Sequence, residues 1–351
     1  GQRLVEVRSD VALAPSTRAI NPNSIAVLPL ENLSPDPEDA YFAAGIHDAL
    51  ITSLSKINAL MVTSGQSARR VNKGLSVPEI GRQLGVAKLL AGSVLLDGDR
   101  VRVLVQLIDA ASDMNLWVDT YERDVTDIIG LQNEVARTIA DIVEIRLTPR
   151  EEKVLAKRDR IQPDAYRTYL KGIYQFFQDT PGADFRGIRI LEEAVRQDPT
   201  SALAHAGVAY GYANIVHTPS PSPVKDAEVK AKEAAEIALR LDPDLAEAHM
   251  ALGMYQYMYE WDFEAAQKSF ERAIELSPSL TLAHYDLGWL YEALGPDYEE
   301  ASLAAGRRTV ELSPLSAYMV GALAWQYADA CQYEEALSLA REAIRPVSYT
   351  H

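Results

Sequence analysis

The stretch from residue 244 to residue 278 constrains the fold of this chain more than any other part of the sequence. Its apolar residues recur at helical spacing in two runs, Ala248, Leu252 and Tyr255, then Phe263, Ala266, Phe270, Ala273 and Ile274. This pattern predicts two amphipathic helices, of which the second ends at Pro278 because proline cannot continue a helix. Gly253 in the first helix indicates that a neighbouring backbone comes close. Such a pair cannot bury its apolar surface alone, so it needs copies of itself beside it.

Copies of this helix pair lie on both sides of it. Prolines end the pattern at Pro199, Pro243, Pro278 and Pro314, at spacings of 44, 35 and 36 residues. The same residue types recur within the copies, as Leu252-Gly253 with Ala266 and Phe270, and as Leu287-Gly288 with Tyr291 and Ala301. These positions resemble the signature of the tetratricopeptide repeat, which spans about 34 residues. The sequence therefore predicts an all-α tetratricopeptide-repeat solenoid.

The solenoid is predicted to span residues 164–345. Its repeats are 164–199, 200–243, 244–278, 279–314 and an incomplete fifth at 315–345, with a lengthened turn at 218–224 (TPSPSPV). Residues 149–163 are charged and helix-prone without a large apolar face, so they are predicted to be a helical connector between two domains. Residues 1–23 end in a turn signal and are interpreted as a linker.

The periodicity before the connector is that of an α/β domain, predicted to span residues 24–148. Apolar runs of strand length occupy residues 24–30, 59–64, 87–96, 100–109 and 116–123, and helical periodicity occupies 39–57, 76–84 and 127–147. Asp97-Gly98-Asp99 is a hairpin signal, because glycine supplies the positive φ that such turns need. Ser76 and Glu79 form a capping-box pattern at the start of the second helix. We expect a compact α/β domain with a mixed sheet.

Three stretches of this domain carry a family resemblance. They are SIAVLPLENLSPDPEDAYFAAGIHDAL (24–50), IGRQLGVAKLLAGSV (80–94) and GDRVRVLVQLIDAASDMNLWVDTYERDVTDIIGLQNEVA (98–136). They resemble TolB amino-terminal-like domains of bacterial signalling proteins, although Leu30 and Ala44 depart from the usual residues. The resemblance implies that the domain and the repeats form a sensory or scaffold half. It also implies an upstream output module, which is a winged-helix DNA-binding domain, a serine/threonine kinase or a nucleotide cyclase, often beyond a membrane span.

The net charge of −16 is unevenly distributed. Residues 1–150 hold 15 Lys and Arg against 19 Asp and Glu, a net charge of −4, and residues 151–351 hold 19 against 31, a net charge of −12. An acidic solenoid repels phosphate backbones, so this segment is not expected to bind nucleic acid. Cys331 is the only cysteine, which excludes an internal disulfide framework.

No run in the sequence approaches the ~18 apolar residues of a membrane span, so none is predicted in this segment. The chain opens at Gly1 without a methionine, and residues 346–351 break the repeat register. The sequence is therefore interpreted as a gene fragment with a non-native tail. Its location is expected to be periplasmic if a membrane span precedes it and cytoplasmic otherwise.

A partner groove is predicted on the first helices of the repeats, because these helices line the concave surface of such solenoids. Its candidate residues are Tyr210, Met250, Met254, Tyr257, Tyr285 and Trp289. Tyrosine, tryptophan and methionine are enriched in binding surfaces. The alternative is that most of these side chains pack between repeats, and the sequence leaves both alternatives open.

Three histidines, His205, His249 and His284, stand at the same phase of successive repeats. Neighbouring helices pack roughly 10 Å apart, which is too far for all three to share one ion. No carboxylate or cysteine completes a ligand set at zinc spacing. We therefore expect core histidines and no metal.

Other patterns that suggest chemistry are weak. Gly81, Gly85 and Gly92 lack the motif of a phosphate loop. The aspartates at 97, 99, 109 and 113 lack the bidentate glutamate of a calcium loop. No nucleophile elbow joins a serine to a histidine and an aspartate. Neither catalytic residues nor cofactors are predicted.

These features together predict a non-catalytic protein-interaction and sensory segment of a bacterial signalling or transcription-regulating protein. A peptide or protein partner would bind in the repeat groove, and the α/β domain would dock beside it. The alternative is the C-terminal regulatory part of a serine/threonine kinase or an adenylate or guanylate cyclase, whose catalytic domain is missing from this segment. A third interpretation is a structural scaffold that self-associates.

Overall fold

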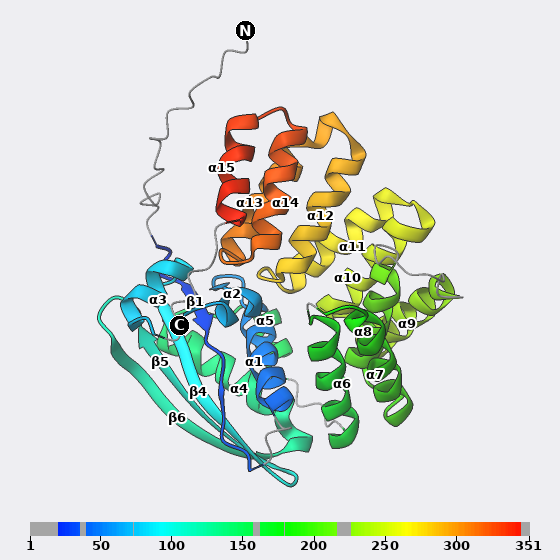
Figure 1. Cartoon of the computed structure of the whole chain (residues 1–351). Helices are drawn as coiled ribbons and strands as arrows, with labels where there is room; N and C mark the ends of the chain where they lie inside the picture. Colours follow the sequence, from blue (N-terminus) through cyan, green and yellow to red (C-terminus); the bar gives the residue numbers. More distant parts are fainter. Residues whose placement is uncertain are drawn as a thin grey trace.

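The computed structural model describes residues 20–35, 40–72, 74–156, 162–178, 180–215 and 226–344. A mixed sheet with its helices forms the N-terminal part, and a curved stack of helices forms the rest (Figure 1). The sequence predicts this division. Most of the expected linker, the 218–224 turn and the 346–351 tail lie outside the described residues.

Six strands of the described residues form the sheet. They are β1 (Ser24–Val27), β2 (Glu31–Asn32), β3 (Met61–Val62), β4 (Lys88–Asp97), β5 (Arg100–Asp109) and β6 (Met114–Asp124). Their order is β3-β1-β4-β5-β6, and β2 pairs with β4. β1 is parallel to β3 and β4, whereas β4, β5 and β6 are antiparallel neighbours. The sheet is therefore mixed, as predicted, although β1 and β3 are shorter than their apolar runs.

Strand β5 shows why one face of the sheet is core. Its inward residues have no exposed surface, and they are Val101, Val103, Val105 and Leu107. Leu104 on the opposite face is 38% exposed. Ile108 shares that face but is buried, because it pairs with Leu89, which belongs to a smaller core on that side of the sheet.

Helices α1 (Ala40–Ser55) and α4 (Ile128–Ile142) form the main core with the sheet. The predicted stripe of α1 is fully buried, at Phe42, Ile46, Leu50 and Leu54. Helix α4 ends five residues earlier than its apolar pattern predicts, where Glu144 adopts a φ of 56°. Two short helices are α2 (Gly65–Arg69) and α3 (Val77–Leu84), and α3 has the predicted capping box.

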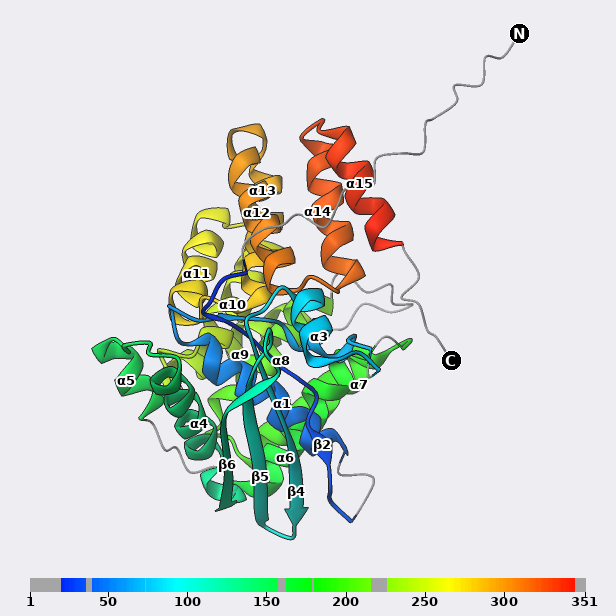
Figure 2. The same cartoon turned by 90° about the vertical axis from the view of Figure 1, so that its left-hand side faces the viewer.

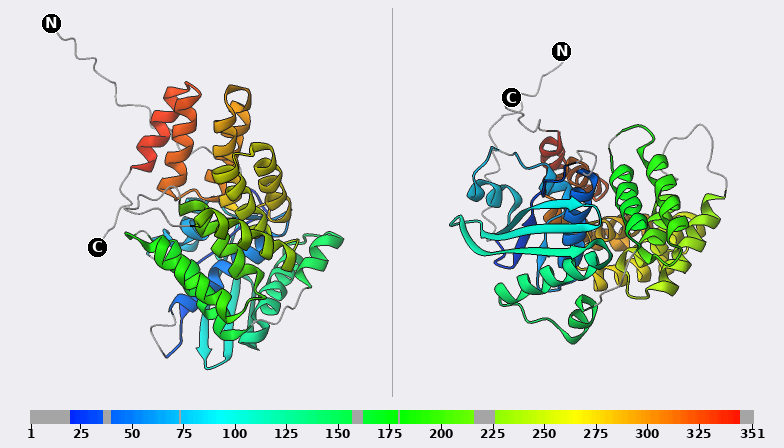
Figure 3. Two further views of the ribbon diagram at one scale, coloured as in Figure 1. Left: turned by 90° about the vertical axis from the view of Figure 1, so that its right-hand side faces the viewer. Right: turned by 90° about the horizontal axis from the view of Figure 1, so that it is seen from below.

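The stack of helices runs from green to red in Figure 3. Ten helices of the described residues form it as five successive pairs. They are α6 (Pro163–Phe176), α7 (Ala183–Gln197), α8 (Ala202–Asn214), α9 (Ala227–Leu241), α10 (Ala246–Tyr255), α11 (Phe263–Leu276), α12 (Thr281–Leu294), α13 (Glu299–Leu312), α14 (Ala317–Asp329) and α15 (Tyr333–Ala343). A π-helical turn, η4 (Gln256–Glu260), extends α10. The fifth pair has both of its helices, whereas the sequence suggests an incomplete repeat.

Gly253 explains how the two helices of the third pair approach each other. A Cβ atom at this position would lie 2.8 Å from the ring of Phe270 and 3.2 Å from the backbone oxygen of Ala266. Both residues belong to the second helix of the same pair. The predicted close approach is confirmed, and any larger residue at this position would push the pair apart.

The connector begins as part of the α/β domain. Helix α5 (Pro149–Leu155) starts with a capping box between Thr148 and Glu151, and Glu151 Oε1 accepts a hydrogen bond of 2.7 Å from the backbone N–H of Asn58. Leu155 is 1% exposed and joins the main core. This half of the connector is therefore fixed to the domain rather than free to hinge.

The helix pairs curve around the α/β domain (Figures 1 and 2). At one end α1 packs on α6 so closely that a Cβ atom at Gly45 would lie 2.6 Å from the side chain of Leu170. At the other end, the segment of β3 and α2 meets the turns that follow α11 and α13. None of the helices in the described ranges is both long and apolar enough to cross a membrane.

Candidate functional site

The first helices of all five pairs converge on one cavity of about 490 Å³, which we call the aromatic cavity. Its aromatic lining is Phe176, Phe177, Tyr210, Tyr257, Tyr285, Trp289 and Tyr318. Gln66 of α2 also lines it, so the α/β domain contributes to its wall. The volume lies within the range of roughly 300–1,000 Å³ that is typical of ligand pockets.

Five of the six predicted groove residues line this cavity, namely Tyr210, Met254, Tyr257, Tyr285 and Trp289. Met250 lies instead in a second cavity, between α1 and the repeats. Tyr210, Met250 and Met254 are buried, whereas the other three are half-buried. Packing between repeats and lining a cavity are therefore not exclusive alternatives, because the same side chains do both.

The rings on α12 and α14 form a connected group at one side of the aromatic cavity. The Tyr285 ring centroid lies 6.1 Å from that of Trp289 and 5.6 Å from that of Tyr318. The hydroxyl oxygens of Tyr285 and Tyr318 are 2.6 Å apart. Tyr318 is 64% exposed, so this side of the cavity reaches the protein surface.

The aromatic cavity is lined by acidic side chains and by no basic side chain of the described residues. The two carboxylates that line it are Asp286 of α12 and Asp184 of α7. Asp286 is 2% exposed, and its Oδ2 atom has no hydrogen-bond partner among the described residues. Burial raises the pKa of the Asp286 carboxyl well above its ordinary value. Burial, and secondly the charge of Asp286, also raises the pKa of Tyr210.

The lining residues Gln66, Phe176, Phe177, Asp286 and Tyr318 are not among those singled out from the sequence. The position of Asp286 in the sequence is nevertheless unusual for a structural residue. It falls between Ala283 and Leu290 on the apolar stripe of α12, where a carboxylate is costly unless something pairs with it.

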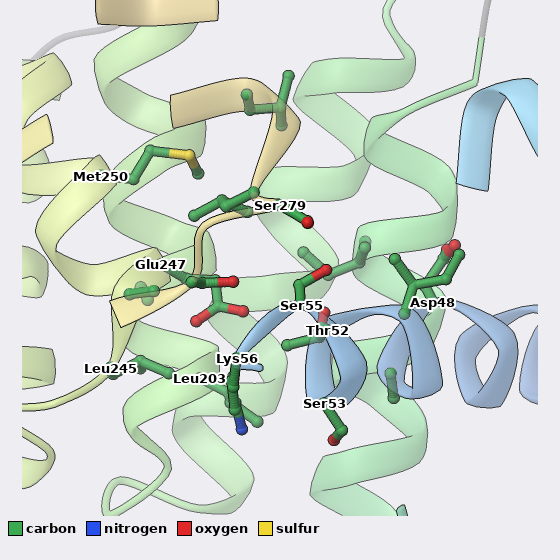
Figure 4. Close-up of a pocket in the computed structure, with 18 of the residues that line it drawn as sticks. Asp48, Thr52, Ser53, Ser55, Lys56, Leu203, Leu245, Glu247, Met250 and Ser279 are labelled. Carbon is green, nitrogen blue, oxygen red and sulfur yellow. The ribbon is translucent and has the colours of Figure 1, made fainter. Parts of the chain in front are cut away.

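The second cavity, of about 350 Å³, lies between the α/β domain and the repeats, and we call it the interdomain cavity. Figure 4 shows Thr52 and Ser55 of α1 opposite Glu247 and Met250 of α10. The Oε2 atom of Glu247 is buried without a hydrogen-bond partner among the described residues. Many residues of both parts line this cavity, and its wall mixes polar and apolar groups.

A cluster of serines fastens the α/β domain to the turns between repeats. This serine junction consists of Ser64, Ser67, Ser279, Ser313 and Ser316. The backbone N–H of Ser64 donates to the Leu312 carbonyl at 2.7 Å, and the hydroxyls of Ser64 and Ser313 lie 2.7 Å apart. The Leu315 N–H donates to the hydroxyl of Ser67 at 2.9 Å. The repeat-ending motifs of the sequence therefore also hold the domain.

Only His205 is buried, whereas His249 and His284 are half-buried, so the expectation of core histidines holds for one of the three. All three share one local contact. The Nε2 atoms of His205, His249 and His284 lie 3.0, 2.9 and 2.9 Å from the carbonyl oxygen of the proline six residues earlier. A carbonyl only accepts, so each Nε2 donates. Burial lowers the pKa of all three imidazoles and favours their neutral form. Each histidine thus ties the start of a first helix to the preceding turn.

Two of the residues that could suggest a phosphate loop or a calcium loop, Gly92 and Asp109, have structural contacts. A Cβ atom at Gly92 would lie 2.0 Å from the carbonyl oxygen of Leu104 on the neighbouring strand. Asp109 accepts hydrogen bonds from the backbone and the hydroxyl of Ser112. Strand packing accounts for Gly92 and turn chemistry for Asp109, as expected from the sequence.

Most of the α/β domain is similar in sequence to one domain of a family of transcriptional regulators. Residues 21–138 match the family described as "HilA/YgeH-like transcriptional regulator, second domain". The match covers the sheet, α1 and most of α4. This description differs from the TolB amino-terminal-like resemblance, which stays a prediction.

The chain is also similar to one curated protein and to several solved helical proteins. It is 34% identical over 201 residues to "Putative adenylate cyclase 3" of Rhizobium meliloti (strain 1021), which covers 57% of this chain and 34% of that protein. The chain thus spans about a third of that relative. Two solved structures are the tetratricopeptide protein TTC0263 of Thermus thermophilus (16% identity, 51% and 90% of the two chains, TM-score 0.43) and pilF of Pseudomonas aeruginosa (18%, 51% and 76%, 0.39).

Proposed function

We propose that this chain is a non-catalytic interaction and sensory module of a bacterial signalling or transcription-regulating protein, and that its aromatic cavity receives part of a peptide or protein partner. The observation that carries this proposal is the convergence of side chains from all five first helices on one cavity. Aromatic side chains supply most of the binding energy in many interfaces, because they bury large areas at low entropic cost.

The position of Gln66 suggests how binding could be communicated. This residue lines the aromatic cavity, and its Oε1 atom accepts a hydrogen bond of 3.2 Å from Ser316 in the serine junction. A partner in the cavity would therefore touch the α/β domain as well as the repeats. Binding shifts an output only if the partner prefers one arrangement of the two parts.

The similarity of residues 21–138 to the second domain of transcriptional regulators supports the regulatory part of the proposal. The alternative function is the regulatory part of a nucleotide cyclase or a kinase. The 34% identity to a protein called an adenylate cyclase favours the cyclase within this alternative. Both functions give the same role to the segment and differ in the output that it controls.

Selection of peptides on the immobilised chain tests the proposal. Peptides selected from a random display library are retested by fluorescence polarisation on the wild type, on Trp289→Ala and on Trp325→Ala. Trp325 is the matched control, because it is 62% exposed on α14 and does not line the aromatic cavity. We expect Trp289→Ala to weaken binding at least about tenfold, as for an interface hot spot, and Trp325→Ala to leave it unchanged. Equal affinities for all three chains would contradict the proposal.

A further inference from the structure

The unpaired carboxylate of Asp286 is the starting observation. Its Oδ2 atom has no partner among the described residues, and the residue is 2% exposed. A buried polar atom without a partner is costly, so it marks either a structural defect or a place where a bound ligand supplies the partner. The aromatic cavity beside it is large enough to hold such a ligand.

We infer that the aromatic cavity binds an organic cation of the ammonium type, with the Asp286 carboxylate as its counter-ion and the surrounding tyrosine and tryptophan faces as its cage. This inference rests on the proposed function and names the chemistry that the site recognises. The negative face of an aromatic ring attracts a cation, and quaternary ammonium groups are bound by aromatic cages in this way.

The other classes of occupant fit the lining less well. An anion would meet two carboxylates and no basic side chain among the described residues that line the cavity. A neutral apolar group would leave the Asp286 oxygen without a partner. A bound metal ion needs several ligands, and no group of three His, Cys, Asp or Glu side chains suited to a metal occurs in the described ranges.

The titration of the site agrees with this assignment. Burial raises the pKa of Asp286, and no basic group of the described lining opposes this effect. Tyr210, Tyr257 and Tyr285 lie near the same carboxyl group, and the pKa of each is raised, first by burial and in smaller part by Asp286. An ammonium group would restore the ionised carboxylate by direct pairing.

An ammonium group can come from a free small molecule or from a lysine side chain of a peptide. Two matched pairs of probes separate these sources. Choline is compared with 3,3-dimethylbutan-1-ol, which has the same shape without the charge. A capped Gly-Lys-Gly peptide is compared with the same peptide containing norleucine. Titration calorimetry measures the dissociation constant of each probe.

Three variants of the full chain complete the experiment. Asp286→Asn removes the counter-ion but keeps the side-chain shape. Asp297→Asn is its matched control, because Asp297 is exposed in the turn before α13 and does not line the cavity. Tyr257→Leu removes an aromatic face but keeps an apolar side chain, and it serves as an independent test if Asp286→Asn changes the fold.

We expect the wild type to bind one or both cations at least about tenfold more tightly than their neutral counterparts, a preference in the range of desolvated cation–π and charge pairing. Asp286→Asn should lose that preference, Tyr257→Leu should weaken it several-fold, and Asp297→Asn should keep it. Choline binding alone would identify a free cation as the ligand, and lysine-peptide binding alone would identify a partner side chain.

Equal binding of charged and neutral probes by the wild type, or an unchanged preference in both cavity variants, would overturn the inference. If no cation binds but library peptides without basic residues bind in a Trp289-dependent manner, the cation inference fails and the proposed function stands. If neither cations nor peptides depend on the cavity residues, both fail.

Discussion

Distant parts of the chain meet at the serine junction and at the aromatic cavity. Buried polar side chains have hydrogen-bond partners at the junction, whereas a buried carboxyl oxygen in the cavity lacks one among the described residues. In the serine junction Ser313 has no exposed surface and its hydroxyl lies within hydrogen-bond distance of both Ser64 and Ser67. In the aromatic cavity Asp286 is almost as buried, and its Oδ2 atom has no partner among the described residues.

This difference separates a permanent contact from a site that is complete only with a ligand. A satisfied network of hydrogen bonds stabilises one arrangement and fixes its geometry. An unpaired buried carboxylate lowers the stability of the protein, and such costs are tolerated where function needs them. The serine junction therefore holds the α/β domain in place, and the aromatic cavity is where binding energy can be gained.

The largest expected effect comes from breaking the serine junction. Ser313→Val replaces the hydroxyl that pairs with Ser64 and Ser67 by a branched apolar side chain. This change should lower the free energy of unfolding by about 2–3 kcal/mol. The change should also speed amide hydrogen exchange of β3 and α2, because these elements lose their anchor. Urea unfolding and exchange mass spectrometry of residues 57–72 measure the two effects.

Ser302→Val is the control for this variant. Ser302 is buried in α13, and its hydroxyl donates to the Gly288 carbonyl at 3.0 Å, inside the repeats and away from the α/β domain. It should lower stability without a local effect on β3 and α2. Equal exchange rates of these elements in both variants would show that the junction does not fasten the domain.

A smaller effect of opposite sign is expected in the aromatic cavity. The pKa of Asp286 is raised in the folded state above its unfolded value of about 3.9, so the folded state holds a proton that the unfolded state has lost. Stability therefore falls as the pH rises above ~4. Asp286→Asn removes this penalty and should stabilise the protein by about 1 kcal/mol at pH 7, a size usual for stabilising substitutions.

Urea unfolding at pH 7 and at about pH 4 checks the sign. The advantage of Asp286→Asn should shrink toward the lower pH, where the wild-type carboxyl is protonated in both states. Asp297→Asn should show no such dependence. A destabilised Asp286→Asn at pH 7 would mean that the carboxylate is paired and that the contrast with the serine junction is wrong.

The smallest expected effect concerns the repeats outside both regions. Burial lowers the pKa of His284 below its unfolded value of about 6.5, so the unfolded state binds the proton more readily. The stability of the protein therefore falls as the pH falls below ~6.5, because the imidazole that burial keeps neutral is protonated more readily in the unfolded state. His284→Gln keeps a donor for the Pro278 carbonyl but does not titrate. Between pH 7 and 5 it should lose about 0.5 kcal/mol less stability than the wild type, and an identical pH dependence would refute this role.

Much of the fold follows from local patterns in the sequence. The prolines that end each helix pair and Gly253 define the repeats, because one helix pair is a unit whose signals lie within about 35 residues. The capping box of α3 and the β4–β5 turn are local in the same way. The lengths of β1 and β3 were harder to predict, since apolar runs continue beyond the ladder hydrogen bonds.

The site was only partly predictable. The groove residues followed from aromatic side chains on first helices, and five of them line one cavity. The contact between Ser64 and Ser313 joins residues 249 positions apart, so a periodic pattern in the sequence cannot predict it. The unpaired state of Asp286 depends on what surrounds α12 in space, which a helical pattern does not contain.

Thermal or urea unfolding with a bound cation tests the central claim most directly. The wild type and Asp286→Asn are unfolded with and without the better-binding cation probe at about 100 times its dissociation constant for the wild type. A ligand that binds only the folded state should stabilise the wild type by about 2.7 kcal/mol under this condition. It should stabilise Asp286→Asn, whose affinity is expected to be at least about tenfold lower, by about 1.4 kcal/mol or less. The same stabilisation of both proteins would contradict the account, because Asp286 would then not be the group that the ligand completes.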